Sequence, residues 1–117
     1  MLVLKNFALG FVLLLAASMS ASANEFEIKH LMKFIAQSQC MYVRNGEKHT
    51  AKDALEHIKK KYEYYSDDIE TTEDFIRLSA SKSSMSGKPY IVECKGQATI
   101  TSEEWLTKEL IRMRQPA

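Results

Sequence analysis

Two short runs of strand-forming residues, each carrying one of the two cysteines, constrain the fold of this chain more than any other feature. CMYVR begins with Cys40, YIVEC ends with Cys94, and the chain has no other cysteine. Aromatic and β-branched residues of this kind favour strands. A disulfide between Cys40 and Cys94 would hold the two runs together although they are far apart in sequence.

The first 23 residues predict that the chain is exported. Lys5 precedes an apolar run over residues 7–17, and the small-residue triplet Ala21-Ser22-Ala23 follows. This order is typical of a secretory signal peptide that is cleaved after Ala23. The apolar run is shorter than the roughly 20 residues that span a bilayer. We therefore expect a mature domain over residues 24–117, with no membrane insertion after cleavage.

Export makes a disulfide between Cys40 and Cys94 the expected state of the two cysteines, because the compartments beyond the cytoplasm are oxidising. If the two runs also pair antiparallel, residue numbers across the pair sum to 134, so that Tyr42 faces Val92. A slip of one residue would turn every side chain to the opposite face. The alternative is a disulfide that ties a strand end to a helix.

The charge balance argues against a nucleic-acid partner. Cleavage removes one lysine and leaves 15 Lys and Arg against 15 Asp and Glu. Domains that bind nucleic acid normally carry a basic excess. The 94 residues that remain are enough for one small domain.

Four segments carry apolar residues at helical spacing: residues 25–39, 51–65, 66–80 and 102–114. Their expected N-caps are Thr50, Thr71 or Thr72, and Thr101. The fold class is therefore α+β, with about four helices, a short two-stranded antiparallel ribbon and one disulfide. The residues expected to face the core are Phe26, Leu31, Phe34 and Ile35 in the first helix, with Ile28 and Met32 at the margins of its stripe, Ala51, Ala54, Leu55, Ile58, Tyr62 and Tyr65 in the second, Phe75, Ile76 and Leu78 in the third, and Trp105, Leu106, Leu110 and Met113 in the last.

The dipeptide Asn45-Gly46 is a strong hairpin signal. The residues after it, HTAKDALEHI, nevertheless indicate the start of a helix rather than a second strand. We therefore expect the turn to lead from the first strand directly into a helix capped by Thr50. Residues 59–61, all lysines, are expected on the solvated side of that helix.

Two loops form the strongest candidate site: the RNGEKH loop (residues 44–49) and the SSMSGKPY loop (residues 83–90). The predicted register brings them together, and a helix N-terminus beside them favours an anion. The expected partner is a small anionic ligand or an unknown protein. The alternative is that Arg44 bonds loop carbonyls and Asn45-Gly46 only turns the chain. The candidate binding residues are Arg44, Asn45, His49, Ser84, Lys88 and Tyr90.

Other chemical patterns are weaker. His49, Asp53 and His57 recur at helical spacing, as zinc ligands can, but His49 precedes the predicted helix and Asp53 is used in capping. Ser79-x-x-Lys82 matches the spacing of a penicillin-binding nucleophile without its accompanying motifs. We therefore expect no metal and no cofactor, and no residue stands out as catalytic.

Three segments resemble a known family: CMYVRNGEKHTAKDALEHIKKKYEYY, TTEDFIRLSASKSSMSGKPYIVEC and SEEWLTKEL. They look like the YfeK-like small exported bacterial proteins, the family of domain of unknown function 5329. The resemblance runs from about Phe34 to Leu110 and implies a periplasmic location and a shared fold, with no assigned activity or ligand. Its shared pattern falls on Arg44-Asn45-Gly46, His49, Ala54 with His57, Phe75-Ile76, and Ser83 through Tyr90.

These observations favour a non-enzymatic periplasmic binding or interaction domain whose contact surface is the junction of the two loops. The rival hypothesis is a small cell-envelope hydrolase or transferase in which His49 is the general base.

Overall fold

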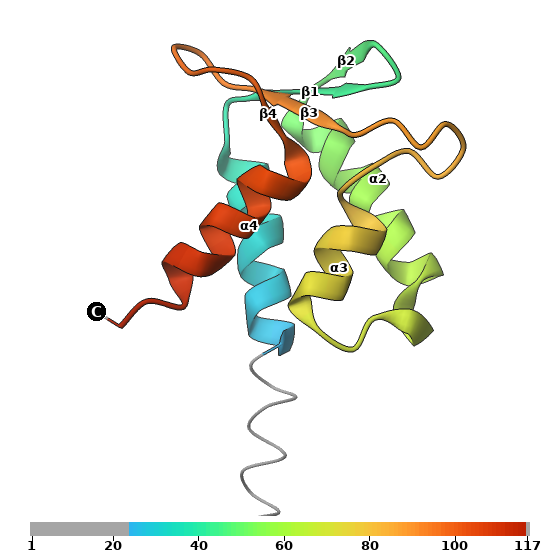
Figure 1. Ribbon diagram of the computed structural model, residues 1–117, viewed down its shortest axis with the longest axis vertical. Coiled ribbons are helices and arrows are strands. Elements are labelled where there is room, and N and C mark those ends of the chain that lie inside the picture. Colours follow the sequence, from blue (N-terminus) through green and yellow to red (C-terminus); the bar gives the residue numbers. More distant parts are fainter. Residues whose placement is uncertain (1–23, 117) are drawn as a thin grey trace, which may run out of the picture.

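The structure is a computed structural model that describes residues 24–116. The predicted signal peptide lies outside the described residues. Within them a sheet lies across one end of a set of helices (Figure 1). The elements in chain order are a helical segment over residues 24–37, β1 (Met41–Arg44), β2 (Glu47–His49), α2 (Ala51–Tyr64), the 3-10 turn η1 (Ser66–Asp68), α3 (Thr72–Ser79), β3 (Ile91–Glu93), β4 (Ile100–Thr101) and α4 (Ser102–Met113).

The central pair of strands forms as predicted. β1 and β3 are antiparallel, with Met41 opposite Glu93 and Tyr42 opposite Val92, so the residue numbers sum to 134. Cys40 and Cys94 form a disulfide. The predicted register and disulfide are therefore both confirmed, and the disulfide is consistent with an exported protein.

The predicted two-stranded ribbon is wrong, because the sheet has four strands in the order β2-β1-β3-β4. Asn45-Gly46 does close a hairpin, between β1 and β2. Asn45 has φ 51° and Gly46 has φ 82°, and positive φ at both central residues is what a type I′ turn requires. β4 pairs with β3 in a second hairpin. β2 and β4 are three and two residues long, too short to show a period of two in the sequence.

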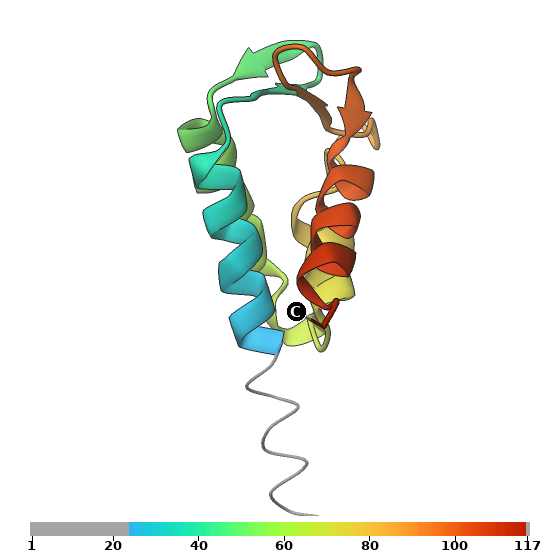
Figure 2. The ribbon, with the colours of Figure 1, turned by 90° about the vertical axis from the view of Figure 1, so that its left-hand side faces the viewer.

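The helices begin where the sequence predicts. The side chains of Thr50, Thr71 and Thr101 each accept a hydrogen bond from the backbone N–H three residues later. Residues 24–37 and α2 lie on one side of the molecule, and α3 and α4 on the other (Figure 2). No helix within residues 24–116 combines the length and apolar character needed to cross a membrane.

The core fills the space between these helices and the inner face of the sheet. The prediction for Phe26 is wrong, since it is 68% exposed, and Ile28 takes its place in the core. The apolar stripe of the first helix is thus rotated from the predicted one, because Ile28, Leu31 and Ile35 follow the helical period better. The buried apolar residues are Ile28, Leu31, Ile35, Tyr42, Ala54, Ile58, Phe75, Ile76, Ala80, Tyr90, Val92, Leu106 and Leu110.

Removing the disulfide should destabilise the domain strongly. It joins residues 54 apart, for which loop-closure entropy predicts a loss of about 4 kcal/mol in the free energy of unfolding. The measurement is urea unfolding of Cys40→Ser/Cys94→Ser against wild type. A reducing agent should lower the wild-type midpoint and leave the double variant unchanged. Equal stability of the two proteins would show that the strand pairing does not depend on the crosslink.

Candidate functional site

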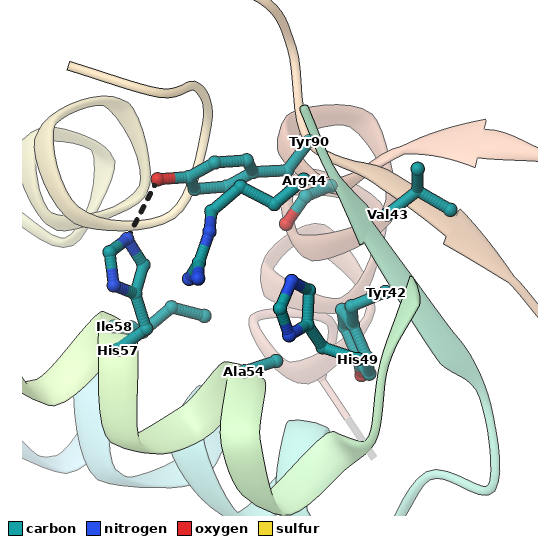
Figure 3. A pocket seen from close by; sticks show the side chains of 9 residues that line it. Tyr42, Val43, Arg44, His49, Ala54, His57, Ile58 and Tyr90 are labelled. Atoms are coloured by element: carbon teal, nitrogen blue, oxygen red, sulfur yellow. Dashed lines mark hydrogen bonds between the residues drawn. The ribbon is translucent and has the colours of Figure 1, made fainter. Parts of the chain in front are cut away.

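A small cavity lies between the inner face of the sheet and α2 (Figure 3). Its volume is about 20 Å³, and one water-sized group needs on the order of 10–15 Å³. Much of its wall is apolar, with Ala54 and Ile58 contributed by α2. The polar groups that reach it are Arg44, His49, His57, Tyr90 and Ser102, together with Tyr42 at its edge.

Strand alternation explains why an arginine faces this cavity. Tyr42 is buried in the core, and Arg44, two residues later on β1, lies on the same face of the sheet. His49 is the cross-strand partner of Tyr42, so it shares that face as well. Figure 3 shows the Arg44 side chain running toward the space between the rings of His49 and His57.

Helix α2 supplies the second wall through Ala54, His57 and Ile58, and Lys61 lies one turn beyond His57 on the same face. The His57 Nε2 atom lies 3.1 Å from the Tyr90 hydroxyl. Lys61 donates to the same hydroxyl at 3.2 Å and to the carbonyl of Lys82 at 2.7 Å. Its Nζ atom also lies 5.1 Å from the centroid of the Tyr90 ring, within range of a cation–π contact.

The prediction that Lys61 is solvated is therefore wrong. Lys59 and Lys60 are exposed, as expected, but Lys61 is half-buried. Residues 82–90 cover it, through the carbonyl of Lys82 and the hydroxyl of Tyr90. These residues are distant from Lys61 in the sequence, so the local pattern did not reveal them.

Positive charge accumulates around the cavity, and the acidic side chain nearest to it is that of Glu47, the exposed cross-strand partner of Arg44. None of the ion pairs among residues 24–116 includes Arg44. Burial, and then Arg44, Lys61, His49 and Lys60 in that order, lower the pKa of His57. Burial and the neighbouring charge of Arg44 also lower the pKa of Lys61. Burial raises the pKa of the Tyr90 hydroxyl, while Arg44 opposes that shift.

His49 adds a polar atom that lacks a partner. Its Nε2 is buried and makes no hydrogen bond to any described residue. The closest carboxylate oxygen, Oε2 of Glu47, is 4.0 Å away, too far for a hydrogen bond. A buried polar group left in this state costs about 1–3 kcal/mol. Such groups in folded proteins are usually bonded to another protein group or to ordered water, so this one needs an explanation.

The two predicted loops do lie against each other. Asn45 donates from Nδ2 to Ser83 Oγ at 3.3 Å, and Ser86 donates to Asn45 Oδ1 at 2.6 Å. These contacts hold the β1–β2 turn to the SSMSGKPY loop. Asn45 therefore connects the two loops and does not line the cavity.

Of the six predicted binding residues, Arg44, His49 and Tyr90 line the cavity, and Asn45, Ser84 and Lys88 do not. A binding role for any of the six stays a prediction. Sequence reasoning missed two further residues, His57 and Lys61. Their spacing of four residues on a helix was the available signal, but it also fits an ordinary solvated helix face.

Residues 24–116 show neither a hydroxyl bonded to the Nε2 of His49 nor a cluster of metal-ligating side chains. The hydroxyl of Ser84 lies 3.3 Å from that of Tyr65, and no described hydroxyl bonds the Nε2 of His49. Across residues 24–116, no three or more His, Cys, Asp or Glu side chains gather closely enough to hold a metal ion.

A larger hollow, of about 340 Å³, lies between residues 24–37 and α4. The buried Glu109 at its base is bonded by Arg112 and His30, at 2.7 and 2.6 Å. Arg112 first, and then His30, lower the pKa of Glu109 to about 2 against the opposing effect of burial. The charged side chains of this hollow are thus paired with one another, unlike those around Arg44.

Comparison with known proteins identifies relatives but no activity. The family model "Family of unknown function (DUF5329)" matches residues 22–114. The chain is 37% identical over 67 residues to "Uncharacterized protein YfeK" of Salmonella typhimurium (strain LT2), an alignment that covers 56% of each protein. The chain therefore spans about half the length of that curated relative. No solved structure matches the chain significantly.

The lowered pKa of His57 predicts a pH dependence of stability. An unfolded histidine takes up a proton near pH 6.5, but folded His57 resists protonation, so the unfolded state binds more protons as the pH falls. Stability should therefore be highest above about pH 6.5 and decrease as the pH drops through the folded pKa. His57→Gln should show a flatter dependence in urea unfolding between about pH 7.5 and about pH 5.5.

The assignment can be checked directly by NMR titration of the His57 ring in a buffer free of oxygen anions. The midpoint should lie below that of an unfolded histidine. A midpoint at or above about 6.5 would contradict the described environment.

Proposed function

This chain belongs to the family of unknown function DUF5329, as its motifs predicted, and we propose that it is a binding domain whose pocket holds a small oxygen anion. The anion is a carboxylate or phosphate group, either free or at the end of a larger molecule. The protein acts, on this proposal, in the periplasm after removal of its signal peptide.

The observation that carries this proposal is one pocket with an unpaired arginine and an unpaired imidazole nitrogen. Arg44 and His49 both line the cavity, and the Nε2 atom of His49 is buried without a hydrogen-bond partner. Arg44 forms no ion pair with a side chain of residues 24–116, and His49 Nε2 forms no hydrogen bond, its nearest carboxylate oxygen being that of Glu47 at 4.0 Å. Charge-assisted hydrogen bonds from such donors to an oxygen anion are among the strongest polar contacts in proteins.

The surroundings strengthen such a contact. Tyr42, Ala54 and Ile58 keep part of the cavity dry, and a charge interaction grows as the local dielectric constant falls. The second cation, Lys61, lies behind the Tyr90 ring and adds to the positive potential. A neutral acceptor would gain less from this arrangement than an anion.

The size of the cavity limits the part of the anion inside it to about one oxygen atom, with the remainder of the carboxylate or phosphate group at its mouth. A volume of about 20 Å³ holds little more than a single water. The rest of a larger molecule would lie at the mouth, beside the β1–β2 turn and the SSMSGKPY loop. The hydrolase alternative gains no support from this geometry, so the proposal stops at binding.

Arg44→Gln should weaken anion binding without harming the fold. Loss of a charged hydrogen bond costs roughly 1.5–3 kcal/mol, so acetate or phosphate affinity should fall by about tenfold or more. The melting temperature should stay the same or rise, because the substitution removes a positive charge that faces His57 and Lys61. Affinity is measured by NMR shift titration and stability by thermal unfolding.

Lys48→Gln is the matched control. It removes one positive charge from β2, but Lys48 pairs with Glu93 at 3.2 Å and does not line the cavity. Anion affinity should therefore stay within about twofold of wild type. If both variants weaken binding equally, the anion responds to net charge rather than to this pocket. A large drop in the melting temperature of Arg44→Gln would make Arg44 a structural residue.

A further inference from the structure

The hydroxyl group of Tyr90 determines where the protons of the pocket lie. A tyrosine hydroxyl has one hydrogen to donate and can accept two. Lys61, an ammonium group, can only donate to it. The one other side chain among residues 24–116 within hydrogen-bond distance is His57. The hydroxyl hydrogen therefore goes to His57 Nε2, which makes His57 neutral with its own hydrogen on Nδ1.

Protonation of His57 breaks this arrangement. A protonated imidazole carries a hydrogen on both nitrogens, so Nε2 would donate to the Tyr90 oxygen alongside Lys61. The hydroxyl hydrogen of Tyr90 would then need a new acceptor. No other described side chain supplies one, but the hydroxyl belongs to a residue that lines the cavity.

The charged groups around His57 explain why it stays neutral while the cavity holds no anion. Burial and then the side chains of Arg44, Lys61, His49 and Lys60 lower its pKa, and no carboxylate is among them. An anion in the cavity would reverse this balance and favour the protonated imidazole. The groups that act on His57 itself are Arg44 of β1, His49 of β2, Lys60 and Lys61 of α2, and the Tyr90 hydroxyl before β3. Lys82 acts on Lys61, and Glu47 lies 4.0 Å from His49.

We propose that the pocket takes up its anion together with one proton from solvent, which His57 holds while the Tyr90 hydroxyl turns from His57 to the anion. The inference rests on the proposed function and states how pH regulates anion binding at that site. An N–H bond forms at His57 as one O–H bond of a hydronium ion breaks, and no other covalent bond changes. Arg44 and His49 then bind the anion beside the Tyr90 hydroxyl.

Proton uptake makes anion affinity depend on pH. By linkage, an anion that binds the protonated form raises the pKa of His57, and a fall in pH raises anion affinity by the same factor. Above the pKa of His57 the protonated fraction falls about tenfold for each pH unit. Acetate should therefore bind at least about tenfold more weakly at about pH 8 than at about pH 6.5.

The test is an acetate titration of the disulfide-intact protein, followed by NMR at both pH values. Acetate stays ionised throughout this range. His57→Gln should lose the pH dependence, with affinities at the two pH values within about twofold. His49→Gln is the matched control, since it removes the other imidazole of the pocket. That variant should bind more weakly at both pH values but keep the dependence.

Tyr90→Phe tests the hydroxyl. It should weaken acetate binding about threefold or more at the lower pH, because the bound anion loses one donor. Undiminished binding by this variant would show that the hydroxyl does not turn to the anion, and would overturn that part of the proposal.

The remaining outcomes separate this inference from the proposed function. Equal acetate affinity at both pH values, or a dependence that survives in His57→Gln, overturns proton uptake at His57 and leaves the anion site standing. No acetate or phosphate binding at any pH overturns both. Nitrogen NMR of the ligand-free protein gives a second measurement, because it should show His57 with its hydrogen on Nδ1. A hydrogen on Nε2 overturns the inference whatever acetate does.

Discussion

The antiparallel pairing of β1 with β3, closed by the Cys40–Cys94 disulfide, is the constraint on which the rest of the structure depends. It sets the register, and the register decides which side chains face the helices. Tyr42 and Val92 enter the core through it. The same alternation turns Arg44 inward, at the end of the sheet where the core stops.

An inward-facing arginine among other basic groups does not help a small domain to fold. Like charges close together disfavour each other, and burial lowers the pKa of both His57 and Lys61. The hollow beside Glu109 shows the ordinary arrangement, in which each buried charge has a partner. Proteins place unpaired buried charge mainly at functional sites, where it costs stability but serves a role. The pocket beside Arg44 is therefore a better candidate site than the hollow beside Glu109.

About half of the pocket could be predicted from the sequence. Arg44, His49 and Tyr90 come from two loops that the predicted register brings together, so strand pairing alone was enough to gather them. His57 and Lys61 could not be found in this way. They lie on a helix whose lysines indicate a solvated face. Only residues 82–90, folded back over that face, bring His57 into the cavity wall and cover Lys61.

The sequence by itself determined the disulfide, the β1–β3 register, the threonine caps and the family, since each depends on a local signal or on a pairing with few alternatives. Only the tertiary structure decided that Asn45-Gly46 closes a hairpin, that the sheet has four strands and that a basic pocket forms beneath it. Strands as short as β2 and β4 show no period of their own. They exist because a neighbouring strand pairs with their backbone N–H and C=O groups, and that neighbour is in place only after the fold has formed.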